Sequence, residues 1–276
     1  MRMIEGHPEG DRLASELPSA LGSAEEIAAH LKGKRAAMFL DYDGTLTPIV
    51  SQPEDAILAD SMRDVLRELA GLCTVAIVSG RDRADVEPLV ALDGLIFAGS
   101  HGFDIKGPGL RMEYEGGKDR LPDLDAAEQE LHERIDPIAG ARVERKRFAI
   151  ANHYRNVVED DVPRVEQAVR EVLAGYERLR LSHGKKVLEL RPDIDWDKGR
   201  AVFWLLEALD LDGDDVLPFY LGDDVTDEDA FAVLSGRGIG VIVGNPSYKT
   251  NASYGLRNTP EVEVFLSQLV GLIRDE

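Results

Sequence analysis

Short apolar runs alternate with amphipathic stretches at both ends of the chain, and this alternation constrains the fold more than any other feature. The apolar runs cover residues 36–40, 75–78, 95–98, 216–221 and 239–243. The helical patterns between and after them cover residues 62–72, 84–92, 199–209, 228–234 and 262–273. A strand followed by a helix, repeated at this spacing, predicts βαβ units and a parallel sheet.

The middle of the chain follows a different order. Its helical patterns and apolar runs cover residues 124–135, 142–144, 147–153, 162–173, 179–182 and 187–190. This αββαββ order predicts an α+β layer with an antiparallel sheet, inserted between the third and fourth strands of the α/β core. We therefore expect three parts: a leader over 1–34 with one helical pattern at 24–31, a core formed by 35–108 and 193–276, and an inserted domain over 109–192.

The charge balance excludes several classes of partner. The chain has 32 Lys and Arg against 52 Asp and Glu, a formal net charge of −20. Such a surface repels nucleic acids and anionic membranes, so we expect a small-molecule ligand instead. The single cysteine, Cys73, excludes an intramolecular disulfide. The polar first ten residues lack a secretory signal, and no apolar run approaches the roughly 18 residues of a membrane span. We expect a cytoplasmic protein.

Polar side chains follow the predicted core strands, at the edge where open α/β sheets bind ligands. They belong to the segments Asp-Tyr-Asp-Gly-Thr, Ser-Gly-Arg, Asp-Lys-Gly and Gly-Asp-Asp-Val-Thr-Asp. The candidate site residues are Asp41, Asp43, Thr45, Ser79, Lys198, Asp223, Asp224 and Asp227. Carboxylates are suitable ligands for a hard cation such as Mg²⁺, while hydroxyls and a lysine are suitable donors to a phosphate.

Each segment alone has a simpler interpretation. Asp-x-Asp also occurs in metal-dependent glycosyltransferases and in plain turns, and Ser79-Gly80 fits a turn. Part of the acidic run at 223–229 fits helix capping. Lys198 is harder to explain, because a cation at the start of a helix opposes the helix dipole. The combination at one sheet edge therefore indicates a single site for a metal ion and a phosphate.

In this order, the four segments resemble the four motifs of the haloacid-dehalogenase superfamily of aspartate-nucleophile phosphatases. Longer stretches are similar to the trehalose-6-phosphate phosphatases, namely residues 40–49, 78–81, 99–102, 184–192, 197–202 and 222–231. The resemblance covers residues 36–276 and is lost in the leader. It implies a Rossmann-like parallel-sheet core with an inserted α+β cap.

The resemblance also implies an activity, the Mg²⁺-dependent hydrolysis of trehalose 6-phosphate to trehalose and phosphate. Its nucleophile would be Asp41, which would form an aspartyl phosphate, and its general acid and base would be Asp43. The implied phosphate ligands are Thr45, Ser79 and Lys198, with Lys198 also counted as catalytic. The implied metal ligands are Asp41, Asp43 through its backbone carbonyl, Asp223, Asp224 and Asp227.

Many of the scarce cations lie in the inserted segment. For most of them, charge alternation along strands is the simpler interpretation. For Arg155, Lys186, Glu189 and Arg191, the resemblance implies recognition of the sugar, and His101 could contribute from its Gly-Ser-His-Gly turn. A carboxylate such as Glu189 is suited to accept hydrogen bonds from sugar hydroxyls.

Three other functions fit parts of the pattern. The same chemistry could act on another sugar phosphate, such as glucosylglycerol phosphate or mannosylglycerate phosphate, because the core motifs do not distinguish the sugar. A regulatory protein that binds metal and sugar phosphate without turnover would not need the Asp41 and Asp43 pair. A metal-dependent glycosyltransferase would have no use for Ser79 and Lys198.

Overall fold

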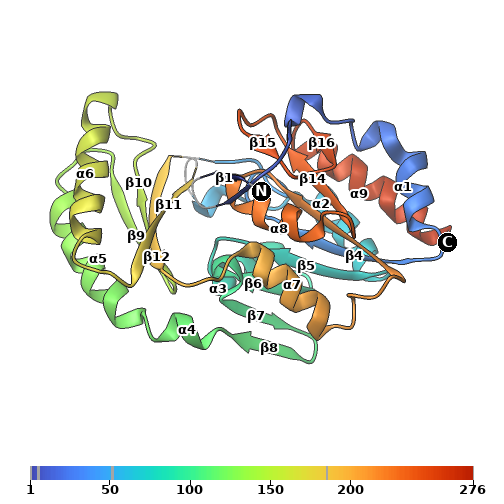
Figure 1. Cartoon of the computed structure of the whole chain (residues 1–276), viewed down its shortest axis with the longest axis horizontal. Helices are drawn as coiled ribbons and strands as arrows, with labels where there is room; N and C mark the ends of the chain where they lie inside the picture. Colours follow the sequence, from blue (N-terminus) through green and yellow to red (C-terminus); the bar gives the residue numbers. More distant parts are fainter. Residues whose placement is uncertain (1, 5–6, 51–52, 185, 276) are drawn as a thin grey trace. The chain divides into compact units, whose positions relative to one another are not determined.

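The computed structural model describes residues 2–4, 7–50, 53–184 and 186–275. The chain forms two compact units (Figure 1). The first contains the residues up to Met112 and from Trp196 onward, and the second spans Glu113–Asp195. The roles of these units, as catalytic core and substrate cap, stay a prediction.

Within the described residues, eight strands form the central sheet of the first unit, in the order β16-β14-β13-β4-β5-β6-β7-β8. The strands are β4 (Arg35–Leu40), β5 (Thr74–Val78), β6 (Ile96–Gly99), β7 (Asp104–Gly107), β8 (Leu110–Glu113), β13 (Val216–Gly222), β14 (Ile239–Val243) and β16 (Tyr254–Leu256). Neighbours from β16 to β6 pair in parallel. Every residue of β13 and β14 is buried, as expected for parallel strands covered on both faces.

Six helices in the described part of the chain accompany these strands, and each of them has buried apolar residues. They are α1 (Ala24–Leu31), α2 (Asp60–Ala70), α3 (Arg83–Val90), α7 (Lys198–Ala208), α8 (Glu228–Leu234) and α9 (Thr259–Arg274). On α2, Met62, Leu66 and Leu69 recur at helical spacing and are fully buried. The start of α9 is capped by the Asn258 side chain, which accepts from the amide of Glu261. The predicted α/β core is confirmed.

One edge of the sheet differs from the predicted all-parallel arrangement. Strands β7 and β8 follow β6, on either side of Pro108-Gly109, and β7 pairs antiparallel with β6. Their sequences contain few apolar residues, so they give no strong strand signal. The sequence also gives no signal for β16, because three residues are too few to show the alternation of apolar and polar side chains that indicates a strand.

The predicted leader contributes to the core of the first unit. The helical pattern at 24–31 becomes α1, whose Ile27 and Leu31 are fully buried in the main apolar cluster. Strand β3 (Arg12–Leu13) pairs antiparallel with β15 (Lys249–Thr250), and β1 (Arg2–Ile4) pairs with β2 (His7–Glu9). The unit also contains short 3₁₀ helices at Ala14–Glu16, Leu21–Ser23, Pro53–Asp55, Ser100–Gly102 and Val225–Asp227.

The second unit has the predicted αββαββ order. After a short helix, α4 (Glu115–Lys118), it contains α5 (Leu121–Ile135), β9 (Arg142–Lys146), β10 (Ala149–His153), α6 (Val162–Leu173), β11 (Leu179–Gly184) and β12 (Val187–Pro192), with a 3₁₀ turn at Glu159–Asp161. The described strands form an antiparallel sheet in the order β11-β12-β10-β9. Both long helices pack on one apolar face, which includes Ile150, Leu188 and Leu190. The α+β insertion is therefore confirmed.

Among the described helices, none has the length and apolar character needed to cross a membrane.

We predict that the Leu31→Ala substitution lowers the free energy of unfolding by about 2–4 kcal/mol, because it leaves a cavity among the core side chains. Urea unfolding of the whole protein measures this loss. The exposed neighbour Lys32 provides the control, since Lys32→Ala should change stability by less than about 0.5 kcal/mol. Similar small effects of both changes would show that α1 does not contribute to the core.

Candidate functional site

The structure brings the four polar segments together at one edge of the first unit. Asp41 follows β4, Ser79 follows β5, and Asp223 follows β13. These three strands are neighbours in the sheet and run parallel, so their carboxyl ends meet. Lys198 begins α7, whose N-cap is the Asp197 side chain.

Lys198 joins two carboxylates at the centre of this edge. Its Nζ lies 2.7 Å from Asp41 Oδ1 and 2.7 Å from Asp227 Oδ1, and all three side chains are buried. Asp227 also accepts from Tyr220 Oη at 2.6 Å and, through Oδ2, from the amides of Asp223 and Asp224. The position of the Asp227 carboxylate is therefore fixed by backbone and side-chain donors together.

A third carboxylate, that of Asp223, completes a cluster with Asp41 and Asp227. One oxygen from each of the three lies within 4.8 Å of the others. The loop after β4 can approach this closely because Gly44 has φ +84° and no side chain. A Cβ at Gly44 would lie 2.0 Å from Asp223 Oδ2, so any other residue would displace the carboxylate.

The electrostatics of the cluster favour an additional cation. Burial raises the pKa of Asp41 well above its usual range, and the like charges of Asp227 and Asp223 add to this against the opposing effect of Lys198. Burial also acts against the charged form of Asp227, but Lys198 and the hydrogen bonds lower the pKa of Asp227 below its ordinary value. The clustered ligand atoms are carboxylate oxygens, which hard divalent cations prefer.

Two hydroxyl groups lie beside the cluster loops. Thr45 is fully buried, and its Oγ1 has no hydrogen-bond partner in the described part of the chain. Ser79 is also buried, and its Oγ accepts from the amide of Arg81 at 3.1 Å. A buried, unpaired hydroxyl is costly, so Thr45 Oγ1 is suited to meet an oxygen of a ligand.

The side chains of two predicted metal residues make other contacts. Asp43 faces Arg81, whose Nε and Nη2 donate to its two carboxylate oxygens at 2.6 and 2.7 Å. Asp224 accepts from the amide of Val225 and caps the 3₁₀ turn that follows it. Of the five predicted metal residues, Asp41, Asp223 and Asp227 are those whose side chains the structure gathers.

His101 lies in the first unit, next to the loop after β5. It is buried, has φ +56°, and its amide donates to the carbonyl of Ser79 at 2.9 Å. A Cβ at Gly80 would lie 3.0 Å from its imidazole ring, so the ring packs against this loop. Its predicted contact with the sugar is untested.

The predicted sugar-binding residues lie in the second unit. Glu189 and Arg191 are buried at alternate positions of β12, so they share the sheet face opposite the apolar cluster. Lys186 has φ +67° and places its Nζ 5.9 Å from the centre of the Tyr154 ring. Arg155 follows β10 in a turn. Lys185, which precedes Lys186 in the sequence, lies outside the described residues.

Sequence reasoning missed a partner of Glu189. Lys146 on β9 donates to Glu189 Oε1 at 2.9 Å, and both side chains are largely buried. Lys146 and Glu189 lie on one face because β9 and β12 both pair with β10, where Ala149 faces Lys146 and Ala151 faces Glu189. The alternation of side chains along β9 indicates the face on which Lys146 lies, but it does not identify Glu189 as its partner.

The profile of the trehalose-phosphatase family matches residues 39–260. The chain belongs to the trehalose-phosphatase family. It is 46% identical to probable trehalose-phosphate phosphatase 2 of Oryza sativa subsp. japonica over 91% of this chain and 72% of that protein. It is 44% identical to trehalose 6-phosphate phosphatase RA3 of Zea mays, over 91% of this chain and 74% of that protein.

Solved structures of the family have the same haloacid-dehalogenase-like fold. The C-terminal domain of C. albicans trehalose-6-phosphate phosphatase superposes with a TM-score of 0.79 at 26% identity, covering 92% of this chain and 98% of that one. A trehalose-6-phosphate phosphatase related protein superposes with a TM-score of 0.76 at 24% identity, covering 87% and 100%. The second of these likenesses supports the fold alone.

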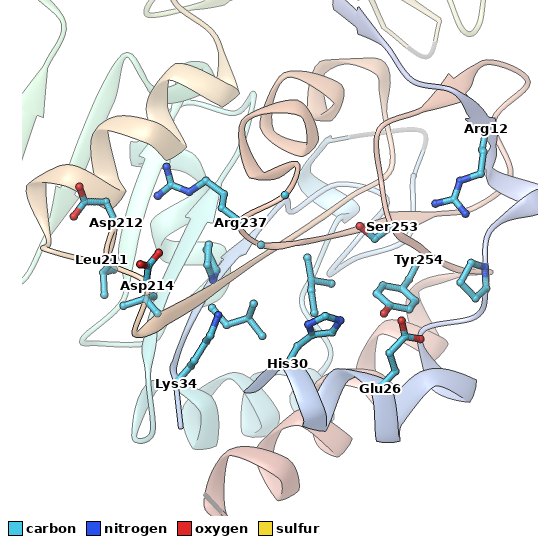
Figure 2. Close-up of a pocket in the computed structure, with 18 residues that line it drawn as sticks. Arg12, Glu26, His30, Lys34, Leu211, Asp212, Asp214, Arg237, Ser253 and Tyr254 are labelled. Carbon is cyan, nitrogen blue, oxygen red and sulfur yellow. The ribbon is translucent and has the colours of Figure 1, made fainter. Parts of the chain in front are cut away.

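A cavity of about 520 Å³ lies at the opposite edge of the sheet, by the amino ends of β13 and β14 (Figure 2). Arg12, His30, Lys34 and Arg237 reach it, together with acidic side chains. The cavity contains none of the predicted site residues.

We predict opposite effects on stability when two of the clustered carboxylates are changed to amides. At pH 7 in EDTA, Asp41→Asn should raise the free energy of unfolding, since burial beside Asp227 and Asp223 makes the ionised form of Asp41 destabilising. Asp227→Asn should lower it by about 1–3 kcal/mol, because the ionised carboxylate of Asp227 accepts from several buried donors that an amide cannot all satisfy. Urea unfolding measures both. A loss in both variants would contradict the distinction between these carboxylates.

Proposed function

We propose that the protein is a Mg²⁺-dependent phosphatase that hydrolyses trehalose 6-phosphate to trehalose and phosphate through an aspartyl-phosphate intermediate. The observation that carries the proposal is the buried contact between Asp41 and Lys198, in a cluster with Asp223 and Asp227. The substrate is inferred from the family and from relatives at 44–46% identity that are named for this activity.

In the first step, the Asp41 carboxylate attacks phosphorus and the bond to the sugar oxygen breaks. The electron pair of that bond goes to the sugar oxygen, which takes a proton from Asp43. In the second step, Asp43 accepts a proton from water while the water oxygen attacks the same phosphorus, and phosphate leaves with Asp41 regenerated. The contact with Lys198 supports this assignment, because it fixes one oxygen of Asp41.

The phosphoryl group needs donors and charge compensation. Thr45, Ser79 and Lys198 would donate to its oxygens, and the unpaired Oγ1 of Thr45 supports this role. Asp41, Asp223 and the backbone carbonyl of Asp43 would hold Mg²⁺. When bound, the ion would offset the negative charge of the carboxylates and of the phosphate.

The second unit would supply selectivity for the sugar. Its candidates are Arg155, Lys186, Glu189 and Arg191. Glu189 is buried and accepts a hydrogen bond from Lys146. A carboxylate can accept several hydrogen bonds, so Glu189 could also accept one from a sugar hydroxyl. The same core chemistry on another sugar phosphate is the alternative that a substrate panel distinguishes.

We predict that the purified protein releases phosphate from trehalose 6-phosphate faster than from other sugar phosphates, and that EDTA abolishes this activity. Asp41→Asn should lower kcat by about 10³-fold or more, because an amide is a poor nucleophile. The exposed Asp64 on α2 offers a matched control, and Asp64→Asn should leave kcat unchanged. Preference for a different sugar phosphate would replace the proposed substrate, and retention of full activity by Asp41→Asn would remove the nucleophile assignment.

We predict that Glu189→Ala lowers kcat/KM for trehalose 6-phosphate by roughly 100-fold, since it leaves polar groups of the bound sugar unpaired. Hydrolysis of p-nitrophenyl phosphate, which has no sugar, should change little. Glu133→Ala, on the exposed side of α5, controls for loss of a glutamate in the same unit. Equal losses on both substrates would assign Glu189 to folding of the second unit instead of recognition.

A further inference from the structure

Asp43 is held by a two-bond contact with Arg81. Arg81 Nε lies 2.6 Å from Asp43 Oδ2, and its Nη2 lies 2.7 Å from Oδ1. The two residues follow neighbouring parallel strands, β4 and β5, so the contact connects two loops of the candidate site. A bidentate pair of this kind fixes the plane of a carboxylate as well as its position.

The guanidinium of Arg81 is itself restrained. The amide of Arg81 donates to Ser79 Oγ at 3.1 Å, and its carbonyl accepts from the amide of Ser100 at 2.6 Å. The guanidinium carbon lies 5.5 Å from the centre of the Tyr42 ring, which is fully buried and donates through its hydroxyl to the carbonyl of Ala56. Arg81 is therefore a rigid support and not a flexible surface cation.

An ordinary surface ion pair does not explain this arrangement well. The Arg81 side chain is only 14% exposed, whereas that of Asp43 is 39% exposed. A pair formed only for stability would gain little at such a partly exposed carboxylate. A general acid has a stricter requirement, because its carboxyl must lie within hydrogen-bond reach of the leaving oxygen. The two hydrogen bonds from Arg81 fix the orientation of the Asp43 carboxylate.

We propose that Arg81 is a positioning residue for Asp43, which confines the Asp43 side chain so that it reaches the leaving oxygen and the attacking water. This inference rests on the proposed function, because it takes Asp43 to be the group that transfers the proton. Arg81 then acts on the reaction through Asp43. Its loss should affect the steps that need proton transfer, and not the binding of substrate.

A double-mutant cycle tests the proposal. Arg81→Ala should lower kcat for trehalose 6-phosphate by about 10-fold or more with KM little changed, because general acid–base catalysis contributes about 10²–10⁴-fold. For p-nitrophenyl phosphate, whose leaving group hardly needs a proton, the rate of phosphoenzyme formation should fall by less than about 3-fold. In an Asp43→Asn background, Arg81→Ala should have almost no further effect on either substrate.

Two further variants sharpen the cycle. Arg81→Lys should restore part of the activity, since an ammonium can donate to Asp43 but cannot form the planar two-bond contact. Arg67→Ala removes an exposed arginine from an ion pair on α2 and should leave all rates unchanged. A crystal structure of Arg81→Ala gives a measurement independent of turnover, in which the Asp43 side chain should occupy more than one rotamer.

Other results would overturn the proposal. A full loss on adding Arg81→Ala to Asp43→Asn would show that Arg81 acts directly on the phosphate. Equal losses in the rate of phosphoenzyme formation from the two substrates would show the same, and unchanged rates or a single unchanged Asp43 rotamer would reduce the contact to a surface ion pair. If the wild-type enzyme prefers a different sugar phosphate, the proposed substrate fails, and the cycle on that ester still decides the role of Arg81.

Discussion

The site depends on one buried ammonium that joins carboxylates from distant parts of the chain. Lys198 lies 157 residues from Asp41 and 29 residues from Asp227 in sequence, yet contacts both at 2.7 Å. Buried carboxylates repel one another, and the cost of burying them falls only when an opposite charge and hydrogen bonds compensate it. The chain leaves the first unit after Met112 and re-enters at Trp196, two residues before Lys198.

The two carboxylates that share Lys198 are not equivalent. Asp227 accepts from Tyr220 and from two backbone amides in addition to the lysine, and these contacts lower its pKa. Asp41 is buried with like charges nearby, and its pKa is raised. One carboxylate is therefore stabilised as an anion and anchors the lysine, while the other is a high-energy anion. An ionised Asp41 would therefore gain more from a bound cation than Asp227 would.

The sequence predicts the parts of this molecule that depend on local pattern. Continuous apolar runs identify β4, β5 and β13, and the rule that parallel strands share a carboxyl edge groups the residues that follow them. Strands β7 and β8 are missed because their short sequences contain few apolar residues. The helical pattern of α1 is visible, but which surface Ile27 and Leu31 pack against is a property of the folded chain. The contacts of Lys146 and Arg81 are missed for the same reason, because side-chain direction across a sheet or between loops has no sequence period.

Asp41 and Asp43 illustrate why spacing alone does not assign roles. In a regular strand, residues two apart point to the same side and would share one environment. Here the strand ends at Leu40, and Gly44 turns the loop so that its amide donates to the carbonyl of Thr47. Asp41 consequently faces Lys198 in the buried cluster, whereas Asp43 faces Arg81 and remains partly exposed. Two identical side chains can divide nucleophilic and acid–base work only if their surroundings differ, and the turn at Gly44 produces that difference.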